Sequence, residues 1–232
     1  MSNTTILITG TRKGIGLHLA EYYLNKNYNV IGCSRRESSL THPNYIHILC
    51  DVSNEKQVRK VVSQGKKKFG KINILINNAG IASLNHSILT PGSLVDKVFK
   101  TNYAGSFYFS RECAKHMMKA KKGRIVNFTS IAVPLNLEGE MVYASSKAAV
   151  EKMTKIMAKE LASFNITVNA LGPSPIYTDL IKVIPKDKLN ELIEQQAIKR
   201  LGEYSDIENV MDFFIDDKSE FITGQIIYLG GL

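Results

Sequence analysis

A tyrosine and a lysine stand four residues apart in the segment MVYASSKAAVEK (141–152), among several small residues. In a helix this spacing places Tyr143 and Lys147 on one face, about one turn apart. A free tyrosine has a pKa near ~10, and a neighbouring ammonium group favours the phenolate and lowers that pKa. The pair is either an acid with the cation that tunes it or an ordinary pair on a helix surface.

Three glycines gather in ITGTRKGIG (8–16), between a strand-like run and a helical pattern. Gly10, Gly14 and Gly16 permit a tight turn and let backbone N–H groups approach a pyrophosphate at the start of a helix, where the helix dipole also favours negative charge. The position of the turn, between the first strand and the first helix of a βαβ unit, favours this interpretation. The alternative is a purely structural turn.

Short β-branched runs alternate with helical patterns along the chain. Most of these runs are continuously apolar, which is typical of strands covered on both faces. The repeated order predicts a doubly wound, Rossmann-like α/β fold with a seven-stranded, mostly parallel sheet and helices on both faces. The predicted strands are 4–9, 29–34, 45–50, 72–77, 124–129, 165–170 and 225–230, and the predicted helices are 14–26, 54–69, 93–121, 142–163 and 204–217.

No linker-like composition or charge block interrupts the pattern, so we expect one domain over residues 1–232. The segment 172–201 departs from the pattern, because it holds three of the six prolines and the short helical pattern KDKLNELIEQQ. A loop of this length inside a compact domain is usually functional. We therefore expect a flap over a binding site.

The formal net charge is +9, but the basic residues are spread along the chain, with short clusters only at 66–68 and 119–124. This distribution favours an anionic small ligand or an acidic partner protein over nucleic acid. None of the histidines shows the spacing of metal ligands, and no segment is long and apolar enough to span a membrane.

The three cysteines are odd in number and widely separated, without CxxC spacing. This pattern argues against a disulfide framework and a zinc site, and is typical of a reducing compartment. The first residues, MSNTTILITG, do not have the pattern of a secretory leader. We therefore expect a cytoplasmic protein.

The glycine spacing TGxxxGxG is the first of several ordered motifs. The others are Asp51-Val52, NNAG (77–80), Asn102, Ser130, Tyr143-x-x-x-Lys147, NALGPSPIYTDL (169–180) and FITGQIIYLGGL (221–232). In this order and spacing the chain resembles the short-chain dehydrogenase/reductase family over nearly its whole length. One departure is Pro173-Ser174, where the family usually has Pro-Gly, so the conformational freedom of glycine is lost at the rim of the nicotinamide site.

The resemblance implies hydride transfer between a nicotinamide cofactor and a carbonyl group. Tyr143 would donate the proton to the carbonyl oxygen, and Lys147 would lower the pKa of Tyr143 and hydrogen-bond the nicotinamide ribose. Ser130 would hold the substrate oxygen, and Asn102 would hold a water in a relay from Lys147 to solvent.

The end of the second predicted strand indicates which cofactor is used. An acidic residue there would bind the ribose 2′-hydroxyl of NAD, but the strand ends in Ser34 and Arg35, which suit a 2′-phosphate. Arg12 and Lys13 add positive charge, so we predict NADPH/NADP; the alternative is that these are solvated surface charges. The cofactor-binding residues implied by the resemblance are Gly10, Arg12, Lys13, Gly14, Ile15, Gly16, Ser34, Arg35, Asp51, Val52, Asn78, Ala79, Gly80, Tyr143, Lys147, Ile176 and Thr178.

Within the family the chain is most similar to 3-oxoacyl-acyl carrier protein reductases, through GRIVNFTS, YASSKAAVEK, ITVNALGP and RLGEYSDI. This implies a ketone substrate on an acidic carrier protein, with Arg124 as a candidate contact. A second basic position of relatives is Phe164-Asn165 here, so that contact is missing or comes from Lys155 or Lys159.

Two other functions stay open, a ketoreductase or alcohol dehydrogenase of a specialised-metabolite or sugar pathway, and a cofactor-sensing binding protein. Relatives are commonly tetramers, so we expect a homo-oligomer, tetramer or dimer. The helix after Lys147 would supply apolar surface for the subunit interface through Ala148, Met153, Ile156, Met157 and Leu161.

Overall fold

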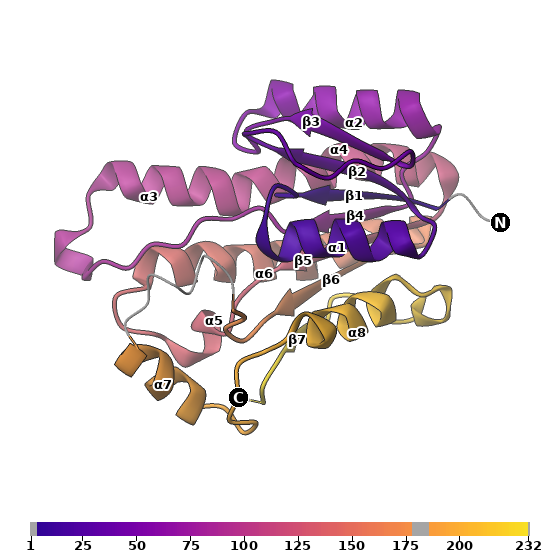
Figure 1. Ribbon diagram of the computed structural model, residues 1–232. Coiled ribbons are helices and arrows are strands. Elements are labelled where there is room, and N and C mark those ends of the chain that lie inside the picture. The colour runs from indigo at the N-terminus through magenta and orange to yellow at the C-terminus, as the bar shows by residue number, and fades with distance from the viewer. Residues whose placement is uncertain (1–3, 178–185, 232) are drawn as a thin grey trace.

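Seven strands form one sheet in the computed structural model, which describes residues 4–177 and 186–231 (Figure 1). The strand order is β3-β2-β1-β4-β5-β6-β7, and each neighbouring pair is parallel. The prediction of a doubly wound α/β fold is confirmed. The strands are β1 (Thr5–Thr9), β2 (Asn29–Ser34), β3 (Tyr45–Leu49), β4 (Ile74–Asn77), β5 (Gly123–Phe128), β6 (Ile166–Gly172) and β7 (Ile226–Tyr228).

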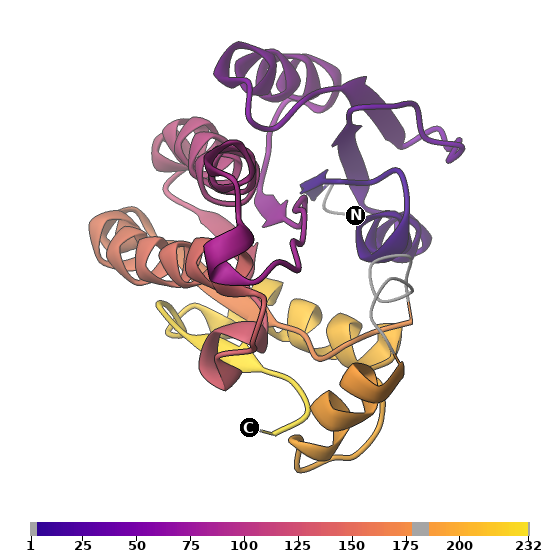
Figure 2. The ribbon, with the colours of Figure 1, turned by 90° about the vertical axis from the view of Figure 1, so that its left-hand side faces the viewer.

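Helices cover both faces of this sheet (Figures 1 and 2). Strand β1 is buried throughout, and it sends Leu7 into one hydrophobic cluster and Ile6 and Ile8 into the other, because alternate side chains of a strand point to opposite faces. The first cluster is covered by α2 (Glu55–Phe69), α4 (Gly105–Ala120) and α6 (Met141–Leu161), and the second by α1 (Gly14–Asn25) and α8 (Tyr204–Ile215). The continuously apolar strands of the sequence are therefore those with a helical layer on each side.

The predicted helix 93–121 is interrupted. It consists of α3 (Gly92–Phe99), a π-helical turn η2 (Lys100–Ala104) and α4. In the π turn the backbone bonds span five residues, and the hydroxyl of Ser106 donates to the carbonyl oxygen of Asn102 at 2.8 Å. Hydrophobic periodicity could not reveal this single-turn change.

Short elements complete the fold. Helix α5 (Ala132–Leu135) and the 3-10 turns η1 (Ser87–Leu89), η3 (Ala162–Phe164) and η5 (Asp217–Ser219) were not expected, whereas α7 (Lys186–Glu194) lies within the predicted 186–196 pattern. Within the described part of the chain, no helix is long and apolar enough to cross a membrane.

Helix α6 buries most of the residues expected at a subunit interface. Met153, Met157 and Leu161 belong to the hydrophobic cluster under the helix, so they pack on their own sheet. Ile156 is 46% exposed and remains available for another subunit. The apolar surface expected from this helix is therefore much smaller than the sequence pattern suggests.

Candidate active site

The motif residues collect at one edge of the sheet, where the parallel strands end; Figure 2 looks onto this edge. Asn78 follows β4, Ser130 follows β5, and α6 brings Tyr143 and Lys147 alongside. The carboxyl ends of strands in an open α/β sheet are where ligands bind, because the loops there diverge around a crevice.

Lys147 is held near Tyr143 by a hydrogen bond to the backbone. Its Nζ donates a hydrogen bond to the carbonyl oxygen of Phe128 at 2.8 Å and lies 5.9 Å from the centroid of the Tyr143 ring. Ser130 is near enough to hydrogen-bond the phenol of Tyr143, and its Oγ also accepts from the backbone N–H of Ala132 at 3.2 Å. The structure thus brings Ser130, Tyr143 and Lys147 together.

Burial controls the protonation of this pair. It raises the pKa of Tyr143 to about 12; hydrogen bonding by Ser130 acts in the opposite direction but is weaker, and the charge of Glu140 adds to the rise. Burial also lowers the pKa of Lys147 to about 8. For the chain without cofactor, loss of solvent outweighs the effect of Ser130, so the pKa of Tyr143 is raised. The lowering expected from Lys147 together with the bound cofactor stays a prediction.

Asn102, in the π turn, links the segment after β4 to α6. Its amide exchanges two hydrogen bonds with the backbone of Ile81, at 2.9 and 3.0 Å, and donates a third to the hydroxyl of Ser146 at 2.9 Å. Ser146 in turn donates to the carbonyl oxygen of Tyr143 at 2.7 Å. The side chain of Asn102 therefore positions backbone, and its role in a water relay stays a prediction.

Asn102 and Lys147 nevertheless lie close together. A Cβ atom added to Gly80 would stand 3.3 Å from Asn102 Oδ1 and 3.4 Å from Lys147 Nζ. The two polar groups thus face the same side of the NNAG turn.

The glycine turn after β1 is locked to its neighbours. Gly10 and Gly14 have φ angles of +79° and +60°, a conformation that glycine adopts most readily. The N–H groups of Gly10 and Thr11 donate to the carbonyl oxygen of Cys33, and the amide of Asn78 donates to that of Thr9 at 2.8 Å. Backbone N–H of Asn78 and of Ala79 both donate to Thr9 Oγ1, so the turns after β1 and β4 form one unit.

Helix α1 starts directly from this turn. A Cβ at Gly16 would lie 2.4 Å from the carbonyl oxygen of Gly10, so the helix packs against the turn at a distance that only glycine permits. Among the described residues, no side chain caps this helix and no acid stands in its first turn, which suits an anion at its N-terminus. Arg12 and Ile15 are partly buried here, and Lys13 is exposed.

A cleft of about 430 Å³ opens beyond the ends of β2 and β3. Arg35 and Lys60 place positive charge on it, next to Asp51, whose carboxylate accepts two hydrogen bonds from Ser53. Its lining consists of Arg35, Leu49, Cys50, Asp51, Gln57 and Lys60. Two cations beside a cleft fit an adenosine that carries a 2′-phosphate.

Some neighbours of this cleft differ from the expectation. Val52 is buried, and the hydroxyl of Ser34 donates to the carbonyl oxygen of Arg36 at 2.5 Å rather than being left for a phosphate. Gln57 and Lys60 were not predicted, although their spacing of three on a helix that starts just after Asp51 is a usable signal.

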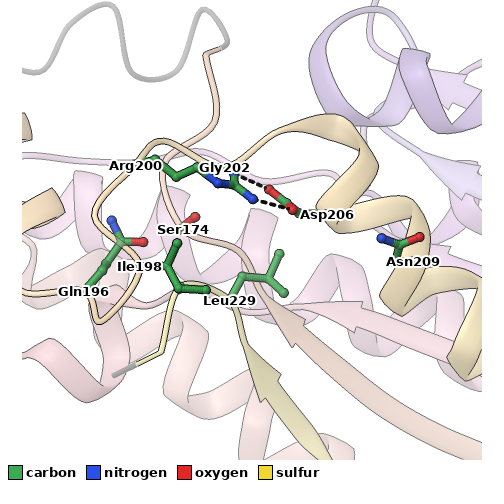
Figure 3. Close-up of a pocket in the computed structure, with 9 residues that line it drawn as sticks. Ser174, Gln196, Ile198, Arg200, Gly202, Asp206, Asn209 and Leu229 are labelled. Atoms are coloured by element: carbon green, nitrogen blue, oxygen red, sulfur yellow. Dashed lines mark hydrogen bonds and ion pairs between the residues drawn. The ribbon is translucent and has the colours of Figure 1, made fainter.

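A second hollow, of about 170 Å³, lies between the segment after β6, the start of α8 and the end of β7 (Figure 3). Ser174 lines it and has no left-handed backbone, so glycine's freedom is not needed there. Gln196 is 2% exposed, and within the described structure both polar atoms of its amide lack a hydrogen-bond partner. Arg200 makes two hydrogen bonds with Asp206 at the rim, at 2.7 and 2.8 Å.

The sequence also predicts roles for Ile176, Thr178 and Arg124. Ile176 pairs with Gly202 in an isolated bridge, while Thr178 lies outside the described residues. Arg124 is only 4% exposed, and its guanidinium lies 3.9 Å from Asp217. It stands near the start of β5, away from Tyr143 and Lys147, and little of its side chain is exposed; its contact with a carrier protein stays a prediction.

A doubly wound parallel sheet with a glycine turn after its first strand, and with serine, tyrosine and lysine gathered beyond β5, defines a dinucleotide-binding oxidoreductase. The family model described as "Enoyl-(Acyl carrier protein) reductase" matches residues 10–231. The chain belongs to the short-chain dehydrogenase/reductase family.

Relatives match over nearly their full length. The 3-oxoacyl-[acyl-carrier-protein] reductase FabG of Staphylococcus epidermidis is 33% identical, over 99% of this chain and 98% of its own. The FabG of Escherichia coli K12 is 29% identical, over 97% of this chain and 95% of its own.

Two solved structures share the fold. Ligand-free aldohexose dehydrogenase of Thermoplasma acidophilum has a TM-score of 0.91 and 28% identity, over 99% of this chain and 94% of its own. ElxO with NADP bound has a TM-score of 0.90 and 31% identity, over 98% of this chain and 97% of its own.

Proposed function

We propose that this protein is an NADPH-dependent carbonyl reductase whose substrate is a 3-oxoacyl thioester on an acidic carrier protein. The meeting of Ser130, Tyr143 and Lys147 carries the proposal, because two hydroxyls and an ammonium group suit a carbonyl oxygen that gains a proton. The raised pKa of Tyr143 favours reduction, since the phenol keeps its proton at neutral pH.

In this mechanism the hydroxyls of Ser130 and Tyr143 hold the ketone oxygen. The bound cofactor supplies a hydride to the carbonyl carbon. As negative charge develops on the oxygen, Tyr143 gives it a proton, and Lys147 stabilises the phenolate that remains. With its pKa near 8, Lys147 can then return a proton to Tyr143.

The cofactor is NADP(H). Arg35 and Lys60 at the cleft beyond β2 and β3 favour the 2′-phosphate, and Arg12 and Lys13 add positive charge at the glycine turn. ElxO, a relative in fold and sequence, was solved with NADP. In the proposed complex the turn 10–16 holds the pyrophosphate.

At the other end of the cofactor, Tyr143 and Lys147 bind the nicotinamide ribose. Asp51 faces the adenine, with the buried Val52 packed behind it, and Asn78 to Gly80 line the path between the two ends. Ile176 and Thr178 border the nicotinamide. These assignments rest on the family resemblance together with the positions of the described residues at one sheet edge.

The substrate class is drawn from the FabG relatives, whose names specify 3-oxoacyl groups on a carrier protein. A net charge of +9 would attract an acidic carrier. With Arg124 buried, Lys155 and Lys159, both exposed on α6, are the better candidates for that contact. The aldohexose dehydrogenase neighbour supports the alternative of a sugar substrate.

Assembly and location belong to the same proposal. We place the protein in the cytoplasm as a homo-oligomer, a tetramer or a dimer, with one catalytic domain over 1–232 and the segment 172–201 as its flap. The free, buried state of Cys33, Cys50 and Cys113 is compatible with a reducing compartment.

A substrate panel tests the function. NADPH oxidation would be followed with acetoacetyl groups on carrier protein and on coenzyme A, with crotonyl thioester and with simple ketones. In a separate arm, reduction of NADP⁺ would be followed with an aldohexose. We expect turnover of both acetoacetyl thioesters, faster on carrier protein. Turnover only of crotonyl thioester would replace ketone reduction by reduction of a carbon–carbon double bond, and activity only on the sugar would support the alternative. Cofactor binding without any turnover would favour a sensing protein.

A further inference from the structure

A histidine outside the predicted site lies at the centre of a hydrogen-bond network at the cofactor end. His47 is on β3, and its Nε2 is 3.0 Å from Ser34 Oγ and 3.1 Å from the carbonyl oxygen of Arg36. Its Nδ1 is 2.9 Å from the hydroxyl of Tyr45 and 3.3 Å from that of Thr11. One imidazole thus joins the glycine turn, the end of β2 and the residues that follow it.

The donors and acceptors of this network fit one tautomer. The carbonyl oxygen of Arg36 can only accept, so the Nε2 of His47 carries the proton and donates to it. Nδ1 then accepts from a hydroxyl, either directly from Tyr45 or from Thr11, to which Tyr45 donates at 3.0 Å. The carbonyl of Arg36 receives a second donor, Ser34 Oγ, at 2.5 Å.

The sheet leaves room for this network at one position of β2. Gly32 pairs with His47 in the β2–β3 register. A Cβ there would lie 2.2 Å from the hydroxyl oxygen of Tyr45 and 2.4 Å from Thr11 Oγ1. Any side chain at residue 32 would push the two hydroxyls aside, so the network depends on a glycine inside a strand.

Two donors, His47 Nε2 and Ser34 Oγ, therefore bind the carbonyl oxygen of Arg36 and fix the backbone of residues 34–36. Between these anchors lies Arg35, whose side chain lines the cleft beyond β2 and β3. Arg35 itself is exposed and forms no ion pair with another described residue, so the backbone of residues 34–36 sets the direction of its side chain.

We propose that His47 is a positioning residue for cofactor selectivity: it fixes the 34–36 turn so that Arg35 faces a 2′-phosphate. This inference rests on the proposed use of NADP(H). His47 touches neither substrate nor reacting atoms and acts through Arg35. Its loss should weaken ligands that carry a 2′-phosphate much more than ligands that lack it.

Direct binding tests this without catalysis. Calorimetric titration would compare 2′,5′-ADP with 5′-AMP on the wild type and on His47→Leu, His47→Gln and His47→Asn. Glutamine places an amide N–H near the position of Nε2, whereas asparagine reaches only that of Nδ1. We expect His47→Leu and His47→Asn to weaken 2′,5′-ADP roughly tenfold, the loss expected for a misplaced charged hydrogen bond, and His47→Gln to recover most of it. The affinity for 5′-AMP should stay within about twofold in all variants.

The matched control is His42→Leu, at a partly buried histidine whose side chain accepts from the N–H of Asn44 and is not hydrogen-bonded to the network; its contact with Tyr45 is through the backbone, which the substitution keeps. It should leave both affinities unchanged. Steady-state kinetics supply a second readout: KM for NADPH should rise in His47→Leu with kcat nearly constant.

Equal losses for the two nucleotides, or equal behaviour of the glutamine and asparagine variants, would overturn the inference and leave His47 a structural residue. If the wild type itself binds 2′,5′-ADP no better than 5′-AMP, the proposed cofactor fails and the inference with it. Failure of the substrate panel alone would not affect these titrations.

Discussion

Two groups of polar side chains in the α/β fold are built differently. Beside β2 and β3, the buried Thr11 and Tyr45 and the half-buried His47 bond to one another and to the backbone of residues 34–36. In the hollow beside α8 (Figure 3), Gln196 is buried, but its amide has no hydrogen-bond partner among the described residues.

The two groups differ in whether their polar atoms are already hydrogen-bonded within the chain. The first group completes its bonds within the chain, so its geometry exists before any ligand arrives. The second group leaves a donor and an acceptor unused, which costs free energy in the folded state. In our proposal the turn that carries Arg35 is thus ordered before a cofactor binds, whereas the amide of Gln196 has no hydrogen-bond partner among the described residues.

The largest effect is expected at Tyr143, the proton donor in the proposed function. Tyr143→Phe removes the proton donor, so we expect kcat for ketone reduction to fall by about 10³-fold, within the range for general acids. The Kd for NADP⁺ should stay within about twofold, as measured by titration. Tyr108→Phe, on α4, is the matched control and should keep normal turnover. Substantial turnover in Tyr143→Phe would remove Tyr143 from its assigned role.

Gly32→Ala should disrupt the hydrogen-bond network of Thr11, Tyr45 and His47. The added methyl group displaces the hydroxyls of Tyr45 and Thr11, and overpacking of this kind costs about 3 kcal/mol of unfolding free energy. Chemical denaturation measures this loss, and the Kd for NADP⁺ should rise in parallel. Gly92→Ala, where a Cβ meets nothing within 4 Å, is the control. Equal stability of the two variants would mean that the network is loosely held.

Lys147 makes stability depend on pH. Its pKa is about 8 in the folded protein against an ordinary 10.5, so between these values the unfolded chain binds more protons and the free energy of unfolding rises with pH. From about pH 7.5 to about pH 9.5 the rise amounts to about 2 kcal/mol. Above pH 10 the raised pKa of Tyr143 acts in the opposite direction.

Lys147→Met should abolish this rise, as followed by urea denaturation across the same pH range. Lys152→Met, at an exposed lysine of the same helix, should preserve it. The same slope in wild type and Lys147→Met would show that the ammonium group is well solvated.

Gln196→Met tests the unsatisfied region, with the smallest expected effect. Methionine keeps the volume and removes the two unpartnered polar atoms, so stability should increase by about 1 kcal/mol and Tm by about 2–4 °C. Gln195→Met, at the exposed neighbour, should leave Tm unchanged. A clear loss of stability in Gln196→Met would show that the amide is hydrogen-bonded, and the two regions would then not differ.

The positions of the strands along the chain, and the motif residues that follow them, could be predicted from the sequence because both are local signals. Apolar runs mark strands with two covered faces, and motif residues such as Ser130 directly follow these runs. The sequence could not show that Arg124 is buried beside Asp217 or that Met153 packs inward, because both depend on contacts between residues far apart in the chain, which no periodicity encodes. The pKa of Tyr143 likewise depends on the atoms packed around it, which a four-residue spacing does not describe.

Because of the π turn at Lys100–Ala104, the number of residues in this segment sets how α3 is rotated relative to α4. Each residue turns a helix by about 100°, so deletion of one residue there would restore an ordinary helix and rotate α3 by that angle relative to α4. Val98, now fully buried, would leave its place, and the amide of Asn102 would turn away from Ile81 and Ser146. A substitution in this turn is tolerated if the new side chain fits. An insertion or deletion, in contrast, rotates all of α3 about the helix axis relative to α4.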